Sequence, residues 1–520
     1  MNRDKMIAAL SEQNNSWDII IIGGGATGAG IAVDAASRGY KTLLLEQNDF
    51  GKGTSSRSTK LIHGGVRYLQ QGNFSLVLEA LKERGLLHAN ARHLVSNLSF
   101  VVPNYDWWEG TFYGVGLKLY DMMAGKYGFG DSRKLSEEET LALIPTLETD
   151  GLRGGVIYYD GQFDDARLLI NLIQTAAEYG ATVINYFRVH DLLKSEGLIN
   201  GVITTDLENS KIYKIKAKVV INATGAFSDS IRKLENSNAT NIIAPSRGTH
   251  IILDRSFLPG NGAIMVPHTS DGRILFAIPW HNKVIVGTTD IAVDKADIEP
   301  KADQEEIDFL LQHVSKYLTK DPTYKDILSV FSGIRPLVKS GASENSYAIS
   351  REHTINISRG GLLTIAGGKW TTYRKMAEDT VDEAIILGQL EPKKSVTENL
   401  RIHGWTEEEI DFNYFGMYGS DAEFVRTLCN QYNMYKLLHP SLSIHEGEVI
   451  WAVKNEMART VEDFLSRRTR ALLLDAKASL ETAPKVAKIM AKELNRNHLW
   501  IKEQIKSYTE LTQNYLPKDL

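Results

Sequence analysis

The apolar positions near the start of the chain predict one strand–helix–strand unit. The run DIIII at 18–22 places four isoleucines in a row after Asp18, which is typical of a strand buried on both faces of a parallel sheet. A glycine-rich turn follows it, then an apolar helix that Gly39 ends, then a second strand, KTLLLE, at 41–46. This order of elements is that of a βαβ unit.

Further along, the period of the apolar positions changes. Between 242 and 290, the runs THIILD, GAIMV, ILFAIPW and KVIVGTTD are separated by short turns, which indicates an antiparallel sheet. The residues after Pro392 are charged and have helical spacing. The other apolar runs predict helices at 74–87, 164–179, 304–318 and 371–387, and strands at 181–193, 201–207, 211–225, 331–338 and 361–368.

The composition excludes some classes of protein. A net charge of -5 argues against binding through bulk positive charge, so we expect no nucleic-acid partner. The single cysteine, Cys429, excludes an internal disulfide and a cysteine-based metal cluster, and we expect no metal. The first residues, MNRDKMIAALSEQNN, are too polar for a signal peptide, and no window holds the about 18 apolar residues of a membrane span. We therefore expect a protein that is soluble or rests on a membrane surface.

The first glycine turn, GGGATG at 23–28, matches the dinucleotide fingerprint G-x-G-x-x-G. Its first glycine makes the tight turn, its second lets a pyrophosphate approach the backbone, and its third lets helix and strand pack closely. The helix N-terminus then faces the phosphates. Glu46, at the end of the next strand, is placed to hold a ribose hydroxyl, and we prefer it to Asp49, which lies beyond the strand end. The cofactor-binding candidates here are Gly23, Gly25, Ala26, Thr27, Gly28 and Glu46.

Two more glycine turns follow predicted strands, at KAKVVINATG (216–225) and GLLTIAGGKWTT (361–372). The spacing of the first turn does not separate NAD from FAD. Three such turns scattered along the chain, however, favour an FAD domain that insertions interrupt. The candidates in these two turns are Ala223, Thr224, Gly225, Gly368, Lys369 and Thr371.

These elements predict an α/β fold class, that of a two-domain FAD-dependent oxidoreductase. A discontinuous, Rossmann-like FAD-binding domain would comprise 16–90, 150–240 and 340–390. A substrate or cap domain, built on the antiparallel sheet, would comprise 91–149 and 241–339. A separate C-terminal helical domain would comprise 391–520. A chain of 520 residues is long enough for about three domains.

The motifs together resemble those of one family, the FAD-dependent, quinone-linked, aerobic-type glycerol-3-phosphate dehydrogenases. The resemblance covers nearly the whole chain, and TSSxSxKLIHGGxRYL and GGKxTTYRKMAE are not generic flavoprotein patterns. The matching segments are IIGGGATGAGIAVDAASRG, TSSRSTKLIHGGVRYL, DDARL, INATGAFSD, IPWHNKVIVGTTD, FSGIRPL, AGGKWTTYRKMAED and EDFLSRRTRALLLD.

The resemblance implies oxidation of sn-glycerol 3-phosphate to dihydroxyacetone phosphate, with hydride transfer to FAD and electrons passed to a membrane quinone. A phosphate dianion needs cations, and arginine suits it best because its planar fork matches the oxygens. The resemblance puts Arg67, Tyr68, Arg335, Arg351 and Lys369 at the substrate pocket. Beside the flavin we expect Thr54 and, from the basic, glycine-broken segment SSRSTKLIHGGVRYLQ at 55–70 that follows it, Ser55, Ser56, Ser58 and Lys60.

A base must take the proton of the substrate's C2 hydroxyl, and histidine has a suitable pKa. His63 and His250 lie inside the family-like motifs, whereas His281 follows Trp280 in a predicted turn and is excluded. Arg335 and Lys369 can stabilise negative charge at the reacting oxygen or the reduced flavin. The sequence does not divide these roles, so the catalytic candidates are His63, His250, Arg335 and Lys369.

Two alternatives remain beside the dehydrogenase. The same fold could act as a glycerol-3-phosphate oxidase that reduces oxygen to hydrogen peroxide, although we see no extra insertion of the kind that oxidases typically carry. A non-catalytic dinucleotide-binding protein would keep the first glycine turn but would not need Arg67, Arg335 and Lys369 together.

Residues 105–129 hold eight aromatic side chains, and two interpretations of them stay open. They can pack under a loop or at a subunit contact, which includes a homodimer. They can also form a monotopic surface that dips into lipid to reach quinone, since Trp and Tyr favour interfaces. The location expected from the second interpretation is cytoplasmic, peripheral on the cytoplasmic membrane. For Arg467, Arg468 and Arg470 we prefer a solvated or salt-bridged helix face to a lipid contact.

Overall fold

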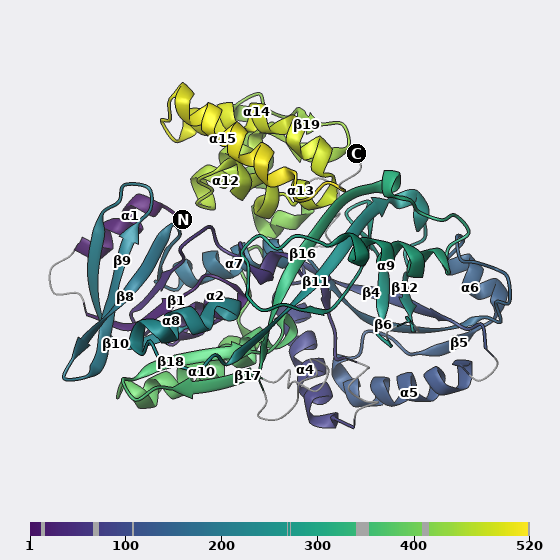
Figure 1. Ribbon diagram of the computed structural model, residues 1–520, viewed down its shortest axis with the longest axis horizontal. Helices are drawn as coiled ribbons and strands as arrows, with labels where there is room; N and C mark the ends of the chain where they lie inside the picture. Colours follow the sequence, from purple (N-terminus) through teal and green to yellow (C-terminus); the bar gives the residue numbers. More distant parts are fainter. Residues whose placement is uncertain are drawn as a thin grey trace.

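The computed structural model describes residues 1–11, 16–65, 72–106, 109–267, 269–270, 272–339, 353–407 and 415–517, with the backbone alone at 11 and 109–112. The strands form two large sheets and one short hairpin. The C-terminal helices lie above both sheets in Figure 1. The predicted fold class, two sheet-based halves with a C-terminal helical region, is confirmed.

The first sheet carries the predicted strand–helix–strand unit, and its central pairs are parallel. Its strands run in the order β17-β18-β10-β1-β2-β7, and β8 and β9 extend it from β10 as an antiparallel ribbon. β1 has parallel partners on both sides, β10 and β2, so its apolar run is buried. The bounds are β1 Trp17–Ile22, β2 Thr42–Leu45, β7 Thr182–Ile184, β8 Phe187–Ser195, β9 Leu198–Asp206, β10 Ile212–Asn222, β17 His353–Ile357 and β18 Leu362–Gly367.

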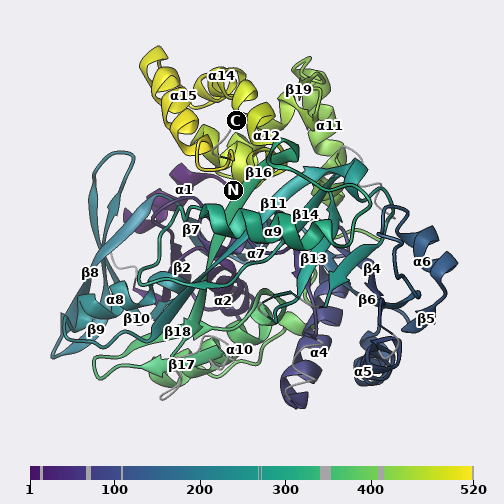
Figure 2. The same cartoon turned by 45° about the vertical axis from the view of Figure 1, so that its right-hand side comes forward.

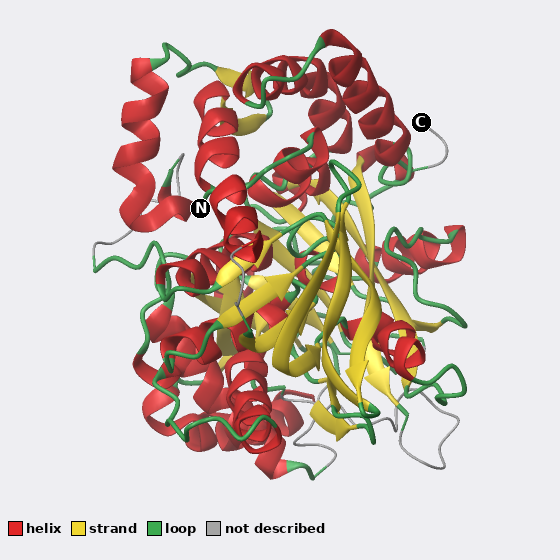
Figure 3. Ribbon diagram, turned by 90° about the vertical axis from the view of Figure 1, so that its left-hand side faces the viewer, coloured by secondary structure: helices red, strands yellow, loops and turns green. Residues whose placement is uncertain are grey.

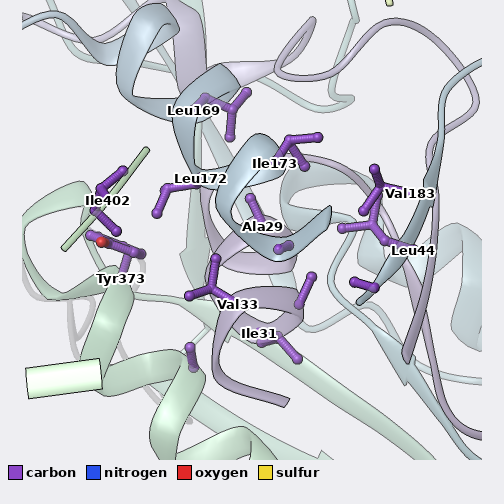
Figure 4. Close-up of a cluster of buried hydrophobic side chains, with 14 of the residues drawn as sticks. Ala29, Ile31, Val33, Leu44, Leu169, Leu172, Ile173, Val183, Tyr373 and Ile402 are labelled. Carbon is purple, nitrogen blue, oxygen red and sulfur yellow. The ribbon is translucent and has the colours of Figure 1, made fainter. Parts of the chain in front are cut away.

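Successive residues of β1 point to opposite faces of this sheet, as a strand requires. Ile19 and Ile21 join the core beneath three helices, α2 (Ala26–Ser37), α7 (Asp165–Glu178) and α10 (Tyr373–Leu387). Ile20 and Ile22 join a second core on the other face, where α8 (Ser228–Glu235) contributes Ile231. Figure 4 shows the helical core, in which side chains of α2, α7 and α10 meet.

The second sheet is almost entirely antiparallel, as the segment 242–290 predicts. Its order is β15-β11-β14-β13-β12-β4-β6-β3, with β16 on β11 and β5 on β6; only β12 and β4 run parallel. β6 lies in a segment that we assigned to the FAD-binding domain, but it pairs with β4 here. The bounds are β3 Leu61–Ile62, β4 Val95–Pro103, β5 Arg133–Leu135, β6 Gly155–Phe163, β11 Ile243–Asp254, β12 Ala263–Val266, β13 Leu275–Trp280, β14 Lys283–Gly287, β15 Ile291–Ala292 and β16 Ile327–Val338.

The aromatic segment around 105–129 contains a helix, α5 (Glu109–Ala124), at the edge of the molecule in Figures 1 and 2. Its inner face is buried through Tyr113, Leu117 and Tyr120. The neighbouring helices of this half are α4 (Phe74–Asn90), α6 (Glu137–Leu143) and α9 (Gln304–Ser315). Among the described residues, no helix is long and apolar enough to cross a membrane.

The C-terminal helices share their core with both sheets, whereas we expected a separate domain. Phe415 and Trp451 belong to the core cluster of α2 and α7, and Phe464 belongs to a cluster that includes strands of the second sheet. Figure 3 shows these helices above the strands. Their bounds, with those of α1 and the hairpin, are α1 Arg3–Ala8, α11 Ala422–Gln431, β19 Leu437–His439, β20 Leu442–His445, α12 Glu446–Asn455, α13 Ala471–Leu474, α14 Ala476–Glu493 and α15 His498–Thr512.

Buried charges bind this C-terminal part to the first sheet. Asp49, just after β2, accepts hydrogen bonds from Arg467 Nε (2.6 Å) and Arg468 Nη1 (2.8 Å). Burial would raise the pKa of Asp49, but the two guanidinium groups hold it well below its usual range. Arg167 of α7 pairs with Glu456 in the same way. The basic residues at 467–470 are therefore ion-paired, as we preferred, but they are buried and do not form a surface face.

Candidate active site

A cavity of about 470 Å³ lies where the two sheets meet. This size is in the range of ligand sites. Segments far apart in the sequence line it, because the strand ends of the first sheet converge there with β11 and β16 of the second. The lining includes Gly23, Gly25, Ala26, Thr27, Glu46, Thr54, Ser55, Ser58, His63, Ala223, Thr224, Gly225, His250, Arg335, Gly368, Lys369 and Thr371.

Three glycines of the first turn, Gly23, Gly25 and Gly28, each have a different structural role. Gly23 has φ of +110°, and a Cβ there would lie 2.7 Å from the Ala223 carbonyl oxygen. A Cβ at Gly28 would lie 1.9 Å from the Gly23 carbonyl oxygen, so this glycine allows α2 to pack on β1 and is not part of the cavity lining. Gly25 has an ordinary φ of -82°, and the nearest atom to its Cβ would be Ser55 Oγ at 3.1 Å. Gly25 thus leaves room on the cavity side.

Two side chains hold this turn in place. The Glu46 carboxylate accepts hydrogen bonds from the amides of Gly24 (2.7 Å) and Asn48 (2.8 Å) at the end of β2. Burial raises the pKa of Glu46. Ser55 Oγ accepts from the amide of Ala26 (2.9 Å), the first residue of α2. The other amides of that first turn have no partner within the helix, and such amides attract anions.

The other two glycine turns reach the same cavity. Ala223, Thr224 and Gly225 follow β10, beside the first turn, and Gly368, Lys369 and Thr371 follow β18. Trp370 Nε1 donates to the Ser55 carbonyl oxygen (2.9 Å), which ties the third turn to the serine-rich segment. A cavity with three glycine turns, a helix N-terminus and a carboxylate suits a long dinucleotide such as FAD.

Ser56 and Lys60 do not line the cavity, contrary to our expectation. Ser56 Oγ donates to the Gly51 carbonyl oxygen (2.9 Å). The fully buried Lys60 ammonium donates to Asp165 (2.7 Å) and to the Ser56 carbonyl oxygen (2.7 Å). An ammonium group cannot be buried without such partners. These two side chains therefore brace the wall from behind, while Thr54, Ser55 and Ser58 line it.

Arg335 is anchored at the other end of the cavity by the loop after β14. Its Nη2 donates to Thr288 Oγ1 (3.0 Å) and to the Thr289 carbonyl oxygen (3.1 Å), and its Nη1 donates to Asp290 Oδ1 (3.2 Å). The guanidinium lies over Gly248 of β11, where a Cβ would come within 2.5 Å of Nη2. These contacts hold the Arg335 guanidinium at one position. A side chain at 248 would displace it from there.

His250 is buried beside Arg335. Its ring stacks on Phe331 (4.8 Å between centroids), and its Nε2 shares a hydrogen bond with Thr59 Oγ1 (2.9 Å). Burial, then the charges of Arg335 and Lys60, hold the pKa of His250 well below its ordinary value. The imidazole is therefore neutral near pH 7, and the same burial and charges make it a weak proton acceptor.

His63 lines the same cavity, and its amide donates to Thr371 Oγ1 (3.3 Å). The structure thus brings His63, His250, Arg335 and Lys369 to one cavity. Arg67, Tyr68 and Arg351 lie outside the described residues. His281, which we excluded, bonds Asp164 at 3.1 Å and does not line the cavity.

Sequence reasoning missed Asp290, Thr288, Thr59 and Gly248. Asp290 and Thr288 belong to the motif IVGTTD, which carried only the resemblance. Their roles depend on pairing between β11, β14 and β16, which a sequence does not display. The sequence signal available for Asp290 was its place at the end of a predicted strand of the sheet that carries Arg335.

A family model described as "FAD dependent oxidoreductase" matches residues 18–374, and one described as "C-terminal domain of alpha-glycerophosphate oxidase" matches 362–501. Mitochondrial glycerol-3-phosphate dehydrogenase of Rattus norvegicus is 40% identical over 96% of this chain and 74% of its own length. That of Homo sapiens is also 40% identical, over 96% and 73%.

Solved structures agree with these matches. The glycerol-3-phosphate dehydrogenase of Bacillus halodurans, complexed with FAD, is similar with a TM-score of 0.81 and 30% identity, covering 100% of this chain and 98% of that one. The FAD-bound L-alpha-glycerophosphate oxidase of Mycoplasma pneumoniae shares the fold, with a TM-score of 0.57 and 18% identity over 74% of this chain and 98% of that one. The cofactor is FAD, and the chain belongs to the FAD-dependent glycerol-3-phosphate dehydrogenase family.

Proposed function

We propose that this protein oxidises sn-glycerol 3-phosphate to dihydroxyacetone phosphate and passes the electrons to a membrane quinone. The observation that carries the proposal is the anchored Arg335 beside neutral His250 in the cavity that also holds the glycine turns. FAD, when bound, accepts the hydride that leaves C2 of the substrate. The relatives named for this activity support the choice of substrate.

The residues of this chain supply binding and proton transfer. Arg335 and Lys369 bring positive charge to the cavity, which favours a phosphate dianion and the negative charge that develops on the C2 oxygen. His63 is the first candidate to accept the C2 hydroxyl proton, and His250 is the second, because its lowered pKa makes it a weaker base. Arg67, Tyr68 and Arg351 are proposed to complete the phosphate site.

Anaerobic titration of the purified yellow protein tests the reaction. We expect glycerol 3-phosphate to bleach the flavin absorbance, while glycerol, which lacks the phosphate, does not. A flavin that stays oxidised under excess glycerol 3-phosphate would reject the proposed substrate. Re-oxidation distinguishes the acceptors: a short-chain quinone should restore the colour without hydrogen peroxide, whereas fast peroxide release in air would identify an oxidase.

The outer face of α5 supports access to a membrane quinone. Val115, Leu119 and Met122 are 69%, 41% and 73% exposed, at the spacing of one helical stripe. The groove beside them is also lined by Lys118, Arg133 and Lys134. An apolar stripe edged by lysine and arginine is the chemistry of a helix that lies in an anionic lipid surface.

Vesicle co-sedimentation tests this face. We expect Met122→Asp to weaken binding to vesicles that contain anionic phospholipid, while Leu198→Asp, at a 59% exposed position of β9, leaves it unchanged. Equal binding by both variants and the wild type would exclude α5 as the membrane contact.

A further inference from the structure

The backbone of the loop after β3 is held from two sides. On one side, the amide of His63 donates to Thr371 Oγ1 (3.3 Å) of the third glycine turn. On the other side, the amide of Gly64 donates to the Tyr120 hydroxyl oxygen (2.7 Å). Tyr120 lies on the inner face of α5 and is 1% exposed. His63, a candidate base, is therefore followed directly by Gly64, whose amide is hydrogen-bonded to α5.

The Tyr120 hydroxyl has one orientation because a charged pair stands behind it. It donates to Asp160 Oδ2 (2.7 Å) of β6, and Asp160 Oδ1 accepts from Arg84 Nη1 (2.6 Å) of α4. A carboxylate only accepts hydrogen bonds, so the hydroxyl proton points to Asp160 and the oxygen lone pairs remain for the Gly64 amide. Such chains of hydrogen bonds strengthen one another in a buried site.

The glycine at 64 is explained by the same contact. A Cβ there would lie 2.6 Å from the Tyr120 hydroxyl oxygen and 2.6 Å from Leu81 Cδ2 of α4, so any side chain would push the loop away from α5. Gly65 follows with φ of +80°, which also favours glycine. The glycine pair thus lets the loop approach α5 closely and then turn.

We propose that Tyr120 is a positioning residue for the oxidation: through the Gly64 amide, it fixes the loop that presents His63 to the cavity. The proposal rests on the proposed function, since its effect is measured on glycerol 3-phosphate. Tyr120 does not line the FAD cavity, so its loss should disturb the substrate and leave the cofactor in place.

The test compares Tyr120→Phe with Tyr508→Phe. Both substitutions remove one buried hydroxyl; that of Tyr508 bonds Ser479 (2.6 Å) within the C-terminal helices. We expect Tyr120→Phe to lower kcat/KM for glycerol 3-phosphate about tenfold, because the Gly64 amide loses its partner, while Tyr508→Phe keeps the wild-type value. FAD content should stay at the wild-type level in both, while thermal unfolding should shift more in Tyr120→Phe, whose hydroxyl makes two hydrogen bonds, than in Tyr508→Phe.

A second variant keeps the test independent of any one substitution. Gly64→Ala inserts the methyl group that the structure excludes, so it should lower kcat/KM as well, and the double variant with Tyr120→Phe should lose less than the product of the two effects. Equal kcat/KM in the wild type and Tyr120→Phe, or equal losses in Tyr120→Phe and Tyr508→Phe, would reject the role of Tyr120 alone. A wild-type flavin that glycerol 3-phosphate does not reduce would instead reject the proposed function.

Discussion

The two ends of the cavity are built from different kinds of group, backbone at one end and side chains at the other. At the end that we assign to the cofactor, backbone groups of three glycine turns form the wall, and the N-terminus of α2 would face the phosphates. At the end that we propose for the substrate, side chains of β11, β16 and nearby loops are fixed by hydrogen bonds to one another. The shape of the first end depends on the path of the backbone. The shape of the second depends on contacts between side chains of different elements.

This difference has a consequence for how each end tolerates change. A backbone wall fails when a side chain fills the space that the ligand needs. A side-chain constellation fails when one anchor is lost, even though the space remains. Substitutions at the two ends should therefore separate cofactor binding from turnover.

Gly25→Val should have the largest effect, at the cofactor end. The ordinary φ of Gly25 accepts any residue, but the new side chain would project toward Ser55 and the cavity. We expect a folded, colourless protein without bound FAD, measured by visible absorbance and thermal unfolding. A Gly25→Val protein that keeps a full complement of FAD would contradict the location of the dinucleotide turn.

Arg335→Ala should have the next largest effect, at the substrate end. Its charge is held at one place by Thr288 and Asp290, and the loss of such a preorganised group costs about 10³-fold in rate. We expect FAD to stay bound while the rate of flavin reduction by glycerol 3-phosphate falls by that factor in stopped-flow measurements. Arg335→Lys, which keeps the charge but not the fork, should fall between the two. Unchanged reduction kinetics in Arg335→Ala would remove Arg335 from the mechanism.

Gly248→Ala should give a smaller change of the same kind. The added methyl group would meet the Arg335 guanidinium at 2.5 Å, so the side chain must shift. We expect kcat/KM to fall about tenfold with FAD retained. The control is Gly116→Ala, where the methyl group would meet no atom within 4 Å. If both variants match the wild type, the guanidinium is not fixed by its contact with β11.

The last effect concerns stability and not turnover, because the C-terminal region braces the first sheet. His403 bonds Asp421 (2.7 Å) and Glu178 at the end of α7; burial alone would lower its pKa, but the two carboxylates raise it to about 9. A folded-state pKa above the ordinary 6.5 means that the stabilisation is complete below pH 6.5 and is lost as pH rises through 9.

Thermal unfolding between pH 6 and pH 10 measures this stabilisation. We expect the wild type to lose about 2 kcal/mol more than His403→Gln over that range, since solvent screens part of the interaction. Parallel stability curves for the two proteins would show that the protonated form of His403 stabilises nothing.

The sequence could predict the cofactor end because its signals are local. The strand, the turn and the helix from Trp17 to Ser37 are continuous in the chain, so the fingerprint can be recognised in one short segment. The substrate end could be predicted only as a set of residues. The contacts of Arg335 with Asp290 and of His250 with Thr59 join separate strands and loops, and no periodicity displays them.

The expectation that Lys60 lines the flavin site failed because its charge is buried in an ion pair. Lys60 appeared as a cation for the cofactor because its partner, Asp165, is distant in sequence. The ion pairs of Asp49 were not predicted either, because its partners Arg467 and Arg468 are more than four hundred residues away in the sequence. β6 belongs to the second sheet although the helix after it packs on the first, so a boundary drawn by sequence order could not separate them.

The pairing of Asp49 with Arg467 and Arg468 sets an order for assembly on the ribosome. Asp49 is synthesised more than four hundred residues before its partners, and removing the partners of a buried charge costs about 3–5 kcal/mol. Until those arginines emerge, the nascent chain must leave this carboxylate in water and the end of β2 unfinished. Glu46, which belongs to the cofactor wall, lies three residues before it. We therefore expect a ribosome-bound fragment that already contains the three glycine turns but lacks Arg467 and Arg468 to retain FAD less well than the full chain.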